Sequence, residues 1–493
     1  MADFRSLFKD TAIYGLSSIV GRFLNYLLVP LYTYVINASS GGYGVVTNLY
    51  SYTALLLVIL TYGMETTFFR FANKSEENPD KVYSTTLISV LTTSVMFVAL
   101  VLAFLNPISR AMGYGDHPSY IWAMAATVAI DAFQCIPFAY LRYRKKALKF
   151  ASLKLAFIGL NICLNLIYFV GLPAAGLNPL GIYDNGIEVG YVFYINLFCT
   201  AVITFFFRGE LRGMFRGFDS SLLRRMLSYS WPILLLGIAG ILNQTASGII
   251  FPYVYKEADA SAQLGIYGAC IKIAMIMSMI TQAFRYAYEP FVFGGASKSD
   301  SRETSAKAMK YFIIFTLLAF LCVEGFMGVL QYIIGAGYRE GLKVVPIVMA
   351  AEIMMGVYFN LSFWYKLTDQ TLWGALFSGA GAAVLLAVDI VFIPKFGYMA
   401  CAWAGVAGYG TAMVLSYLVG QKKYPVPYQL REIAVYLAAA AVLYALMVLG
   451  KRLPGAASLA LNCLLIAAFC ALIVRRDLPL SALPVVGKYF RKK

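Results

Sequence analysis

The sequence predicts an all-α integral membrane protein with about fourteen transmembrane helices. Of its 493 residues, 60% are hydrophobic and 13% are charged, whereas an ordinary soluble chain is about 25% charged. Apolar stretches of about 20 residues, the length of a helix that crosses a bilayer, recur along the whole chain. Both observations favour a bundle of membrane-spanning helices.

Hydropathy divides the apolar sequence into fourteen predicted spans. They are 11–36, 44–69, 83–105, 119–141, 151–171, 187–207, 230–254, 264–293, 311–334, 344–365, 372–393, 398–420, 431–449 and 458–474. The N-terminal "MADFRSLFKD" leads into the first span without a small-residue cleavage site. We therefore expect a retained first helix and not a signal peptide.

The positive charges alternate between the two sides of these spans. Of the 40 Lys and Arg residues, 30 lie at the termini and in every second loop, 7 lie in the other loops, and 3 lie inside spans. The positive-inside rule then predicts that both termini are cytoplasmic. This topology explains the net charge of +16 without a nucleic-acid partner.

Several classes of protein do not fit the loops. The loops are short and contain no phosphate-binding GxxxxGK[ST] segment, which argues against an ATP-driven pump. They also lack room for the catalytic outer loops of a glycosyltransferase or polymerase, so we expect no enzyme. The eight cysteines form no CxxC pair and the single histidine, His117, lies in a loop. We therefore expect no metal site or cofactor.

An internal repeat is visible between the first span, "GLSSIVGRFLNYLLVPLY", and the seventh, "GIAGILNQTASGIIFPYV". An offset of 222 aligns Gly15 with Gly237, and a shift of one residue then aligns Gly44 with Gly265. Such repeats are typical of alternating-access transporters. The repeat predicts two pseudo-symmetric six-helix bundles followed by two further helices. The expected domains are 1–210 (spans one to six), 211–422 (spans seven to twelve) and 423–493 (spans thirteen and fourteen with a basic tail).

A polar stripe follows one face of the first span. Ser18, Arg22 and Asn25 are spaced by four and three residues, which places them on the same side of a helix. The repeat matches Arg22 with Gln244 of the seventh span. The small and polar residues of both stripes could line a cavity or allow close helix packing. Packing does not require a permanent charge, so Arg22 is expected to face a cavity and a ligand.

The other charges inside the spans have more than one interpretation. Span eight contains Lys272, Gln282, Arg285 and Glu289. Arg285 and Glu289 are four residues apart and could neutralise each other. The remaining carboxylates inside spans are Glu65, Asp131, Glu324, Glu352 and Asp389. They could carry H⁺ or Na⁺ during transport, or serve as counter-ions for Arg22, Lys272 and Arg285. A gate formed by Glu65 and Arg285 across the two halves is one hypothesis.

Four segments carry a family resemblance. "FKDTAIYGLSSIVGRFLNYLLVPLYTYVI", "GGYGVVTNLYS", "AFRYAYEPFVF" and "DIVFIPKFGYMACAWAGVAGYG" resemble the Wzx-type polysaccharide flippases of the multidrug/oligosaccharidyl-lipid/polysaccharide (MOP) exporter superfamily. The resemblance covers essentially the whole chain. It implies that the two bundles form a V around a central cationic cavity. It also implies that Arg22 and Arg285 stand where relatives bind the pyrophosphate of their substrate.

The function implied by this resemblance is transport of undecaprenyl-diphosphate-linked oligosaccharide from the cytoplasmic to the periplasmic leaflet by alternating access. The cargo would be a repeat unit of O-antigen, capsule or exopolysaccharide. A lipid II flippase and a cation-coupled multidrug exporter of the same superfamily remain alternatives. Drug exporters of the superfamily rely on acidic cavities, and a basic first span departs from that pattern.

The expected site has two sets of residues. The substrate-binding set is Arg22, Arg285, Lys272, Asn25, Ser18, Gln244 and Gln282. The gating or ion-coupling set is Glu65, Asp131, Glu289, Glu324, Glu352 and Asp389. We expect no cofactor, but coupling to H⁺ or Na⁺ and to the membrane potential. The expected protein is a monomer in the bacterial inner membrane, in contact with bilayer lipids, the lipid-linked substrate and polysaccharide polymerase or other assembly proteins.

Overall fold

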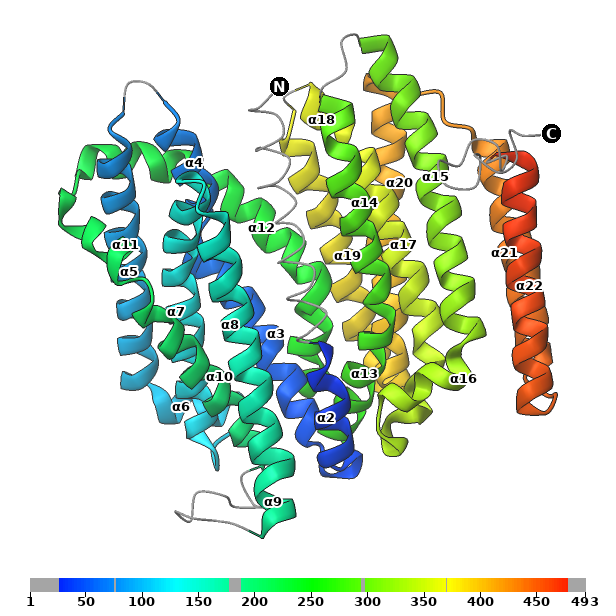
Figure 1. Cartoon of the computed structure of the whole chain (residues 1–493), viewed down its shortest axis with the longest axis horizontal. Helices are drawn as coiled ribbons and strands as arrows, with labels where there is room; N and C mark the ends of the chain where they lie inside the picture. The colour runs from blue at the N-terminus through cyan, green and yellow to red at the C-terminus, as the bar shows by residue number, and fades with distance from the viewer. Residues whose placement is uncertain (1–25, 75–76, 177–187, 294–297, 369, 478–493) are drawn as a thin grey trace. The chain divides into compact units, whose positions relative to one another are not determined.

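The computed structural model describes residues 26–74, 77–176, 188–293, 298–368 and 370–477, with the backbone alone at 188, 286–293 and 298–301. Every regular element in these residues is a helix (Figure 1). Twelve of the helices are long and apolar enough to cross a membrane. A thirteenth span results if the bent pair Val189–Phe205 and Arg208–Arg216, whose axes differ by 64°, is one span.

These thirteen segments correspond to predicted spans two to fourteen. Only the end of predicted span one falls within the described residues, as a short helix from residue 28 to residue 35. The predicted fold class is confirmed, because the chain is an all-α, multi-pass membrane protein. Helix length and apolar composition were sufficient to find the spans, since a bilayer about 30 Å thick requires about 20 apolar residues in each.

The chain forms two compact units. Unit 1 comprises Met1–Ala269 and Leu386–Cys401, and unit 2 comprises Cys270–Leu385 and Ala402–Lys493. The predicted domain limits at 210 and 422 follow the sequence repeat instead, and they stay a prediction.

The helices of unit 1 are mostly single spans or parts of spans. They are α2 (Leu28–Val35), η1 (Ala38–Ser40), α3 (Gly42–Thr61), α4 (Met64–Ala72), α5 (Pro79–Ala103), α6 (Leu105–Ala111), α7 (Pro118–Tyr143), α8 (Ala147–Leu166), η2 (Ile167–Gly171), α9 (Leu172–Ala175), α10 (Glu188–Phe205), α11 (Arg208–Leu211), η4 (Arg212–Arg216) and α12 (Ser220–Val254). Three longer helices contribute residues to both units. They are α13 (Ala260–Ala274), α19 (Leu372–Phe396) and α20 (Tyr398–Lys423).

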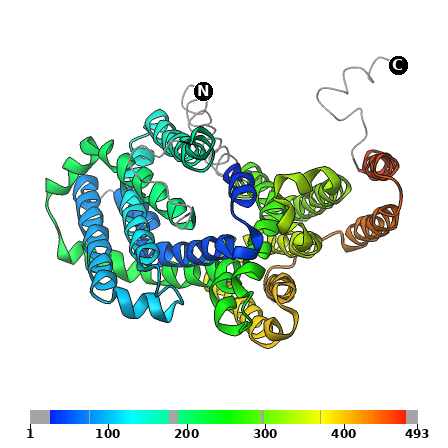
Figure 2. The ribbon, with the colours of Figure 1, turned by 90° about the horizontal axis from the view of Figure 1, so that it is seen from below.

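The remaining helices belong to unit 2. They are α14 (Ile276–Phe293), α15 (Lys298–Gly325), α16 (Met327–Leu330), η5 (Gln331–Ile333), η6 (Ala336–Val344), α17 (Val345–Leu361), α18 (Phe363–Leu367), α21 (Leu430–Gly450) and α22 (Gly455–Arg476). Helices α21 and α22 lie side by side (Figures 1 and 2) and both pack on α15.

A sharp break divides predicted span two into α3 and α4. Tyr62 and Gly63 both have positive φ angles, 31° and 72°, a region that glycine adopts without strain. A Cβ atom at Gly63 would also lie 2.9 Å from Cγ2 of Ile233 on α12. The break starts a new helix, and it places Glu65 in the first turn of α4.

Helix α12 begins well before its apolar part. Asp219 caps it by accepting a hydrogen bond from the backbone N–H of Leu222 at 3.0 Å. This bond, together with the Ser221 hydroxyl and the ammonium of Lys81, holds the pKa of Asp219 well below its usual range. The helix has 35 residues and is therefore about 50 Å long. Its basic first turns, with Arg224 and Arg225, extend beyond an apolar layer of about 30 Å.

Each unit has its own apolar core. In unit 1, fully buried side chains from α4, α5 and α7 meet around Phe68, Leu87 and Ile136. In unit 2, Phe312 of α15 belongs to one cluster with Tyr436 of α21 and Phe469 of α22.

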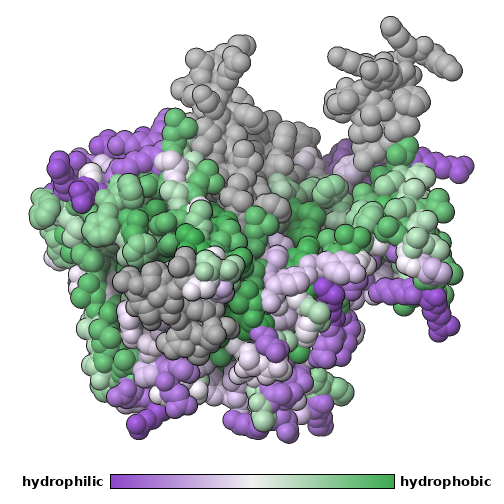
Figure 3. Space-filling view, turned by 60° about the horizontal axis from the view of Figure 1, so that its bottom comes forward, coloured by the Kyte–Doolittle hydropathy of each residue, from purple (hydrophilic) through white to green (hydrophobic). Residues whose placement is uncertain are grey.

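Large apolar side chains also cover much of the outside of the helices. Val95, Met96 and Leu100 of α5 are more than half exposed, and so is Leu464 of α22. Figure 3 shows hydrophobic residues over a broad part of the face in view and strongly hydrophilic residues near its margins. Apolar helix surfaces of this kind are suited to contact with lipid chains.

Candidate substrate and ion sites

Arg285 lies half-buried on α14 in unit 2. Its guanidinium carbon is 5.5 Å from the centre of the Phe359 ring on α17, within the range of a cation–π interaction. The ring face contributes to holding the Arg285 side chain in place. Gln282, one turn earlier on α14, is also half-buried. Both residues are inside a predicted span, as expected from the sequence.

Lys272 lies in the last turn of α13 and is half-buried. One turn residue, Met275, lies between α13 and α14. Backbone hydrogen bonds from Met275 to Ile271 at 2.9 Å and from Met279 to Met275 at 3.2 Å continue the helical pattern, and Ala260–Arg285 is one candidate span.

Four predicted site residues cannot be placed by their side chains. Ser18, Arg22 and Asn25 lie outside the described residues, and only the backbone is described at Glu289. Their assigned roles stay predictions.

The polar side chains around Gln244 on α12 differ in exposure. Gln244 is exposed, whereas Asn243 and Ser247 are buried. The Asn243 amide donates a hydrogen bond to the backbone oxygen of Ala239 at 2.9 Å. The Ser247 hydroxyl donates to Oδ2 of Asp389 on α19 at 2.7 Å. Gln244 thus presents its amide outward, and Ser247 directs its hydroxyl to a buried carboxylate.

Asp389 and Glu352 are carboxylates embedded in apolar helices. Asp389 is fully buried in unit 1 beside Ser247, and it interacts electrostatically with the thiol of Cys401. Glu352 of α17 is close enough to Tyr409 of α20, in unit 2, to interact electrostatically. Oδ1 of Asp389 and Oε2 of Glu352 have no hydrogen-bond partner among the described residues.

Glu65 is paired with a cation in unit 1. Its carboxylate forms an ion pair with Arg142, in the last turn of α7, and accepts a hydrogen bond from the Cys135 thiol at 3.1 Å. The guanidinium of Arg142 also lies 5.1 Å from the ring centre of Phe69. The sequence placed Arg142 in a basic loop and did not suggest this partner. The sequence-based hypotheses gave Glu65 a gating partner, Arg285, and three candidate counter-ions, Arg22, Lys272 and Arg285.

Asp131 of α7 also has a cation nearby. It interacts electrostatically with Lys154, which lies two turns into α8. The Lys154 ammonium is 4.0 Å from the ring centre of Phe138. The sequence counted Lys154 among the loop cations, because it stands only four residues inside predicted span five.

Glu324 of α15 is buried in unit 2. One of its oxygens lies 3.9 Å from Nζ of Lys451, in the turn between α21 and α22. This geometry favours the counter-ion interpretation for Glu324. Its cation comes from a loop, whereas the sequence offered Arg22, Lys272 and Arg285.

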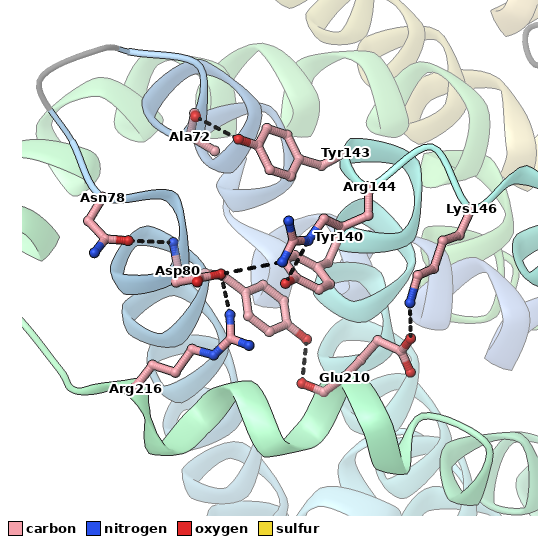
Figure 4. A network of polar contacts seen from close by, with 10 residues as sticks. Ala72, Asn78, Asp80, Tyr140, Tyr143, Arg144, Lys146, Glu210 and Arg216 are labelled. Atoms are coloured by element: carbon pink, nitrogen blue, oxygen red, sulfur yellow. Dashed lines mark hydrogen bonds and ion pairs between the residues drawn. The ribbon is translucent and has the colours of Figure 1, made fainter. Parts of the chain in front are cut away.

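A network of ion pairs lies near the junction of α7 and α8. Asp80 of α5 lies between Arg144 and Arg216 (Figure 4), and the Arg144–Asp80 distance is 3.9 Å. Glu210 of α11 forms two ion pairs. Its Oε2 lies 2.7 Å from Nζ of Lys149, and its Oε1 lies 4.0 Å from Nζ of Lys146. These cations all belong to the side that the sequence predicts to be cytoplasmic.

Sequence reasoning missed one buried cation. Lys310 of α15 is 6% exposed and forms ion pairs with Glu432 of α21 and Asp477, directly after α22. Tyr436 donates a hydrogen bond to the same aspartate. Burial tends to raise the pKa of Asp477, but the bonds from Lys310 and Tyr436 outweigh it and leave this pKa below its ordinary value. No motif marks this cluster, because its members are 122 and 167 residues apart.

The titratable groups do not gather in the manner of a metal centre. Within the described residues, no group of three or more His, Cys, Asp or Glu side chains is arranged to hold a metal ion.

Comparison with a known family places these features in context. The family model described as "Polysaccharide biosynthesis protein" matches residues 7–287, which is more than half of the chain. None of the curated proteins matches the chain at a significant level.

Solved structures share the fold at low sequence identity. "Lipid II flippase MurJ, inward closed conformation" has a TM-score of 0.70 and 13% identity, over 93% of this chain and 98% of that one. An inward-facing multidrug resistance MATE family transporter of the MOP superfamily has a TM-score of 0.65 and 14% identity, over 84% and 95%. The MATE multidrug transporter DinF-BH has a TM-score of 0.60 and 16% identity, over 84% and 95%. The resemblance to the MOP superfamily predicted from the sequence is confirmed.

Proposed function

The chain belongs to the polysaccharide biosynthesis protein family, and on that premise we propose that it is a flippase for a lipid-linked oligosaccharide. The cargo is an undecaprenyl-diphosphate-linked repeat unit of O-antigen, capsule or exopolysaccharide. It moves from the cytoplasmic to the periplasmic leaflet of the inner membrane by alternating access, without a catalytic step. Spans thirteen and fourteen, α21 and α22, are additions to two six-helix bundles.

The observation that carries this proposal is the presence of half-buried cations inside membrane spans. A charged side chain at mid-bilayer costs about 2.5–3.5 kcal/mol on insertion scales, so its retention calls for a ligand or a counter-ion. The Arg285 guanidinium lies against the Phe359 ring, and Lys272 lies in the same unit. An arginine fork matches the paired oxygens of a phosphate group.

The remaining members of the proposed substrate site are polar. Arg22 is assigned to the diphosphate together with Arg285 and Lys272. Hydrogen bonds to the substrate are assigned to Ser18, Asn25, Gln244 and Gln282. The lipid chain stays in the bilayer, so only the head group needs a polar path. An inside-negative potential favours outward movement of the anion by about 2.3 kcal/mol per charge per 100 mV.

Ion coupling is proposed for the carboxylates, in two groups. Asp389 and Glu352 lie in apolar surroundings and are suited to bind and release H⁺ or Na⁺. Glu65, Asp131 and Glu324 have a cation nearby and are suited to gating by exchange of ion pairs. For Glu289, we propose both roles, ion coupling and gating. The protein is proposed to be a monomer with cytoplasmic termini, and its partners are polysaccharide polymerase or other assembly proteins.

The decisive experiment is complementation of bacterial strains that lack a flippase and make different glycans. Restored surface polysaccharide in a strain with a defined lipid-linked oligosaccharide supports the proposal and narrows the cargo. Rescue of a strain depleted of its lipid II flippase, without rescue of any polysaccharide strain, would favour the lipid II alternative. Export of cationic drugs as the sole activity would favour the multidrug alternative.

Variants of Arg285 test the chemistry in the same assay. Arg285→Ala is expected to abolish surface polysaccharide while the protein remains inserted, as checked by membrane fractionation. Arg285→Lys should restore less than the charge alone would predict, because it loses the bidentate fork. Arg452→Ala, in the exposed turn between α21 and α22, is the matched control and should transport normally. Normal transport by Arg285→Ala would contradict the assigned role.

A further inference from the structure

One face of α7 is partly exposed, although α7 has the largest buried share of any candidate span in the described residues. Asp131, Cys135 and Arg142 are separated by four and seven residues, which places them within about 40° of each other around a helix. All three are half-buried, whereas Ala132 and Ile136 between them are fully buried. The partly exposed side chains on this part of α7 are therefore polar.

Two cations and two carboxylates meet along this face. Arg142 forms an ion pair with Glu65 of α4, whose side chain is 39% exposed. Lys154 of α8 interacts electrostatically with Asp131 and with the thiol of Cys135. The four charged groups belong to unit 1, and their formal charges cancel.

Aromatic rings support both cations. The guanidinium of Arg142 lies 5.1 Å from the ring centre of Phe69 and 5.9 Å from that of Phe150. Lys154 has its ammonium 4.0 Å from the ring centre of Phe138. Ring faces attract a cation without accepting a proton or a full hydrogen bond. Both cations would therefore stay in place if an incoming anion displaced their carboxylate partners.

We propose that Arg142 and Lys154 form a phosphate-binding site within unit 1, which Glu65 and Asp131 neutralise while it is empty. This inference rests on the proposed function, because its ligand is the diphosphate of the lipid-linked glycan. A diphosphate bridging a lipid and a sugar carries two negative charges, which match the two cations. When it leaves, the carboxylates return to the cations, so neither charge faces the apolar interior alone.

The depth of the two cations gives the site a direction. Arg142 lies in the last turn of α7, two residues before Arg144. Figure 4 shows Arg144 and Lys146 in the basic network at this end of the helix. Asp131 lies eleven residues earlier on the same helix, about 16 Å further into the span. A phosphate arriving from the basic end would meet Arg142 before Lys154. The site then serves as the first binding step on the cytoplasmic side.

Cys135 provides a built-in reporter, because its half-buried thiol donates to Glu65 between the two cations. The experiment measures the rate at which a small maleimide modifies Cys135 in the purified full chain, by mass spectrometry of its peptide. Sodium pyrophosphate should slow this reaction several-fold relative to sodium chloride at equal ionic strength. Lys154→Gln and the double variant E65Q/R142Q, which removes both charges of one pair, should lose the slowing.

Two controls separate this site from the rest of the protein. Arg285→Ala lies in the other unit and should keep the slowing, and so should Lys146→Gln at the nearby surface. A wild-type rate that pyrophosphate does not change would overturn the inference. Slowing that persists in both Lys154→Gln and E65Q/R142Q would overturn it as well.

Failure of the inference and failure of the proposed function give different results. If pyrophosphate protects Cys135 but no lipid-linked glycan is transported in complementation, the phosphate site stands and the flippase assignment fails. If glycan transport is restored and Lys154→Gln and E65Q/R142Q transport as well as the wild type, the flippase assignment stands and the inference fails.

Discussion

At the scale of single residues, the carboxylates inside the spans differ in what compensates their charge. Glu65 and Glu324 have cations at ion-pair distance, and Asp131 has Lys154 nearby. Asp389 accepts a hydrogen bond from the Ser247 hydroxyl, and Glu352 lies close enough to Tyr409 to interact electrostatically. A carboxylate without a cation is costly to keep charged in an apolar interior. Binding of a proton or Na⁺ removes that cost, which is the physical reason for assigning ion coupling to Asp389 and Glu352.

Substitution of these two residues tests that assignment. Asp389→Asn and Glu352→Gln keep shape but cannot exchange a proton, so each should lower glycan transport by about tenfold or more, equivalent to about 1.4 kcal/mol. The residual transport should no longer respond to external pH or Na⁺, measured in membrane vesicles. Asp259→Asn, an exposed carboxylate outside the spans, should behave as the wild type. Full transport with an unchanged ion response in both variants would exclude the coupling role.

The sequence predicted which carboxylates lie inside spans but not their partners. Asp389 and Glu352 stand in long apolar runs, so their location followed from hydropathy alone. Arg142, Lys154 and Lys451 stand at the ends of spans, where helix limits read from sequence are least certain. A long cationic side chain can also extend along a helix from such a position. The pairing therefore depends on tertiary contacts that no spacing in the sequence encodes.

At the scale of elements, α3 and α13 approach each other very closely at two glycines of unit 1. A Cβ atom at Gly44 would lie 1.8 Å from the backbone oxygen of Ser261, and one at Gly265 would lie 2.9 Å from the backbone nitrogen of Gly44. These two glycines are also the pair that the sequence repeat aligns. Helix backbones can meet this closely only where no side chain intervenes. This close packing explains the glycines at positions 44 and 265, whether or not they line a cavity.

Alanine substitution should therefore be costly at this contact. Gly44→Ala is expected to lower stability by about 3 kcal/mol or more, because backbone atoms cannot yield as a flexible side chain can. The measurement is the thermal unfolding of the detergent-solubilised protein. Gly159→Ala on α8 is the control, since its Cβ would meet nothing within 4 Å. It should be neutral or slightly stabilising. Equal melting temperatures for Gly44→Ala and the wild type would contradict this close contact.

The ion pairs of Lys310 fasten α21 and α22 to α15. Removing this buried cation with Lys310→Met would leave Glu432 and Asp477 without it, at a cost of about 3–5 kcal/mol. We expect the helical pair to loosen. The readout is oxidative crosslinking of Cys322 on α15 to Cys470 on α22, which are close enough to interact electrostatically. The crosslink should form more slowly in the variant.

Lys307→Met on the same helix is the control, because its pair with Glu303 is exposed and contributes about 0–1 kcal/mol. The lowered pKa of Asp477 adds a pH dependence. Its contribution to stability is complete above the ordinary aspartate range and is lost as pH falls through the lowered value. Identical crosslinking rates in Lys310→Met and Lys307→Met would argue against the fastening role.

At the scale of the whole molecule, the fold class and the spans could be predicted because bilayer thickness fixes helix length. The interruptions within spans could not. Tyr62 and Gly63, both with positive φ, interrupt span two between α3 and α4, and a π-helical turn at Ile167–Gly171 interrupts the regular α-helix of span five before α9. Each interruption occurs within a stretch of sequence that is apolar without a gap. At Gly63, the reason is packing against Ile233 of the neighbouring helix α12, which leaves no room for a Cβ atom.

The charge asymmetry makes a prediction for the complete chain. With 30 Lys and Arg residues on one side and 7 on the other, the side that holds the termini should be cytoplasmic. Single cysteines test this in cells with a permeabilised outer membrane, by labelling with a membrane-impermeant maleimide. Arg452→Cys and Lys256→Cys, at α21–α22 and α12–α13, should be labelled from outside. Lys422→Cys and Lys145→Cys should be labelled only after the inner membrane is opened. The reverse pattern would invert the direction assigned to transport and would place Arg142 on the side of release.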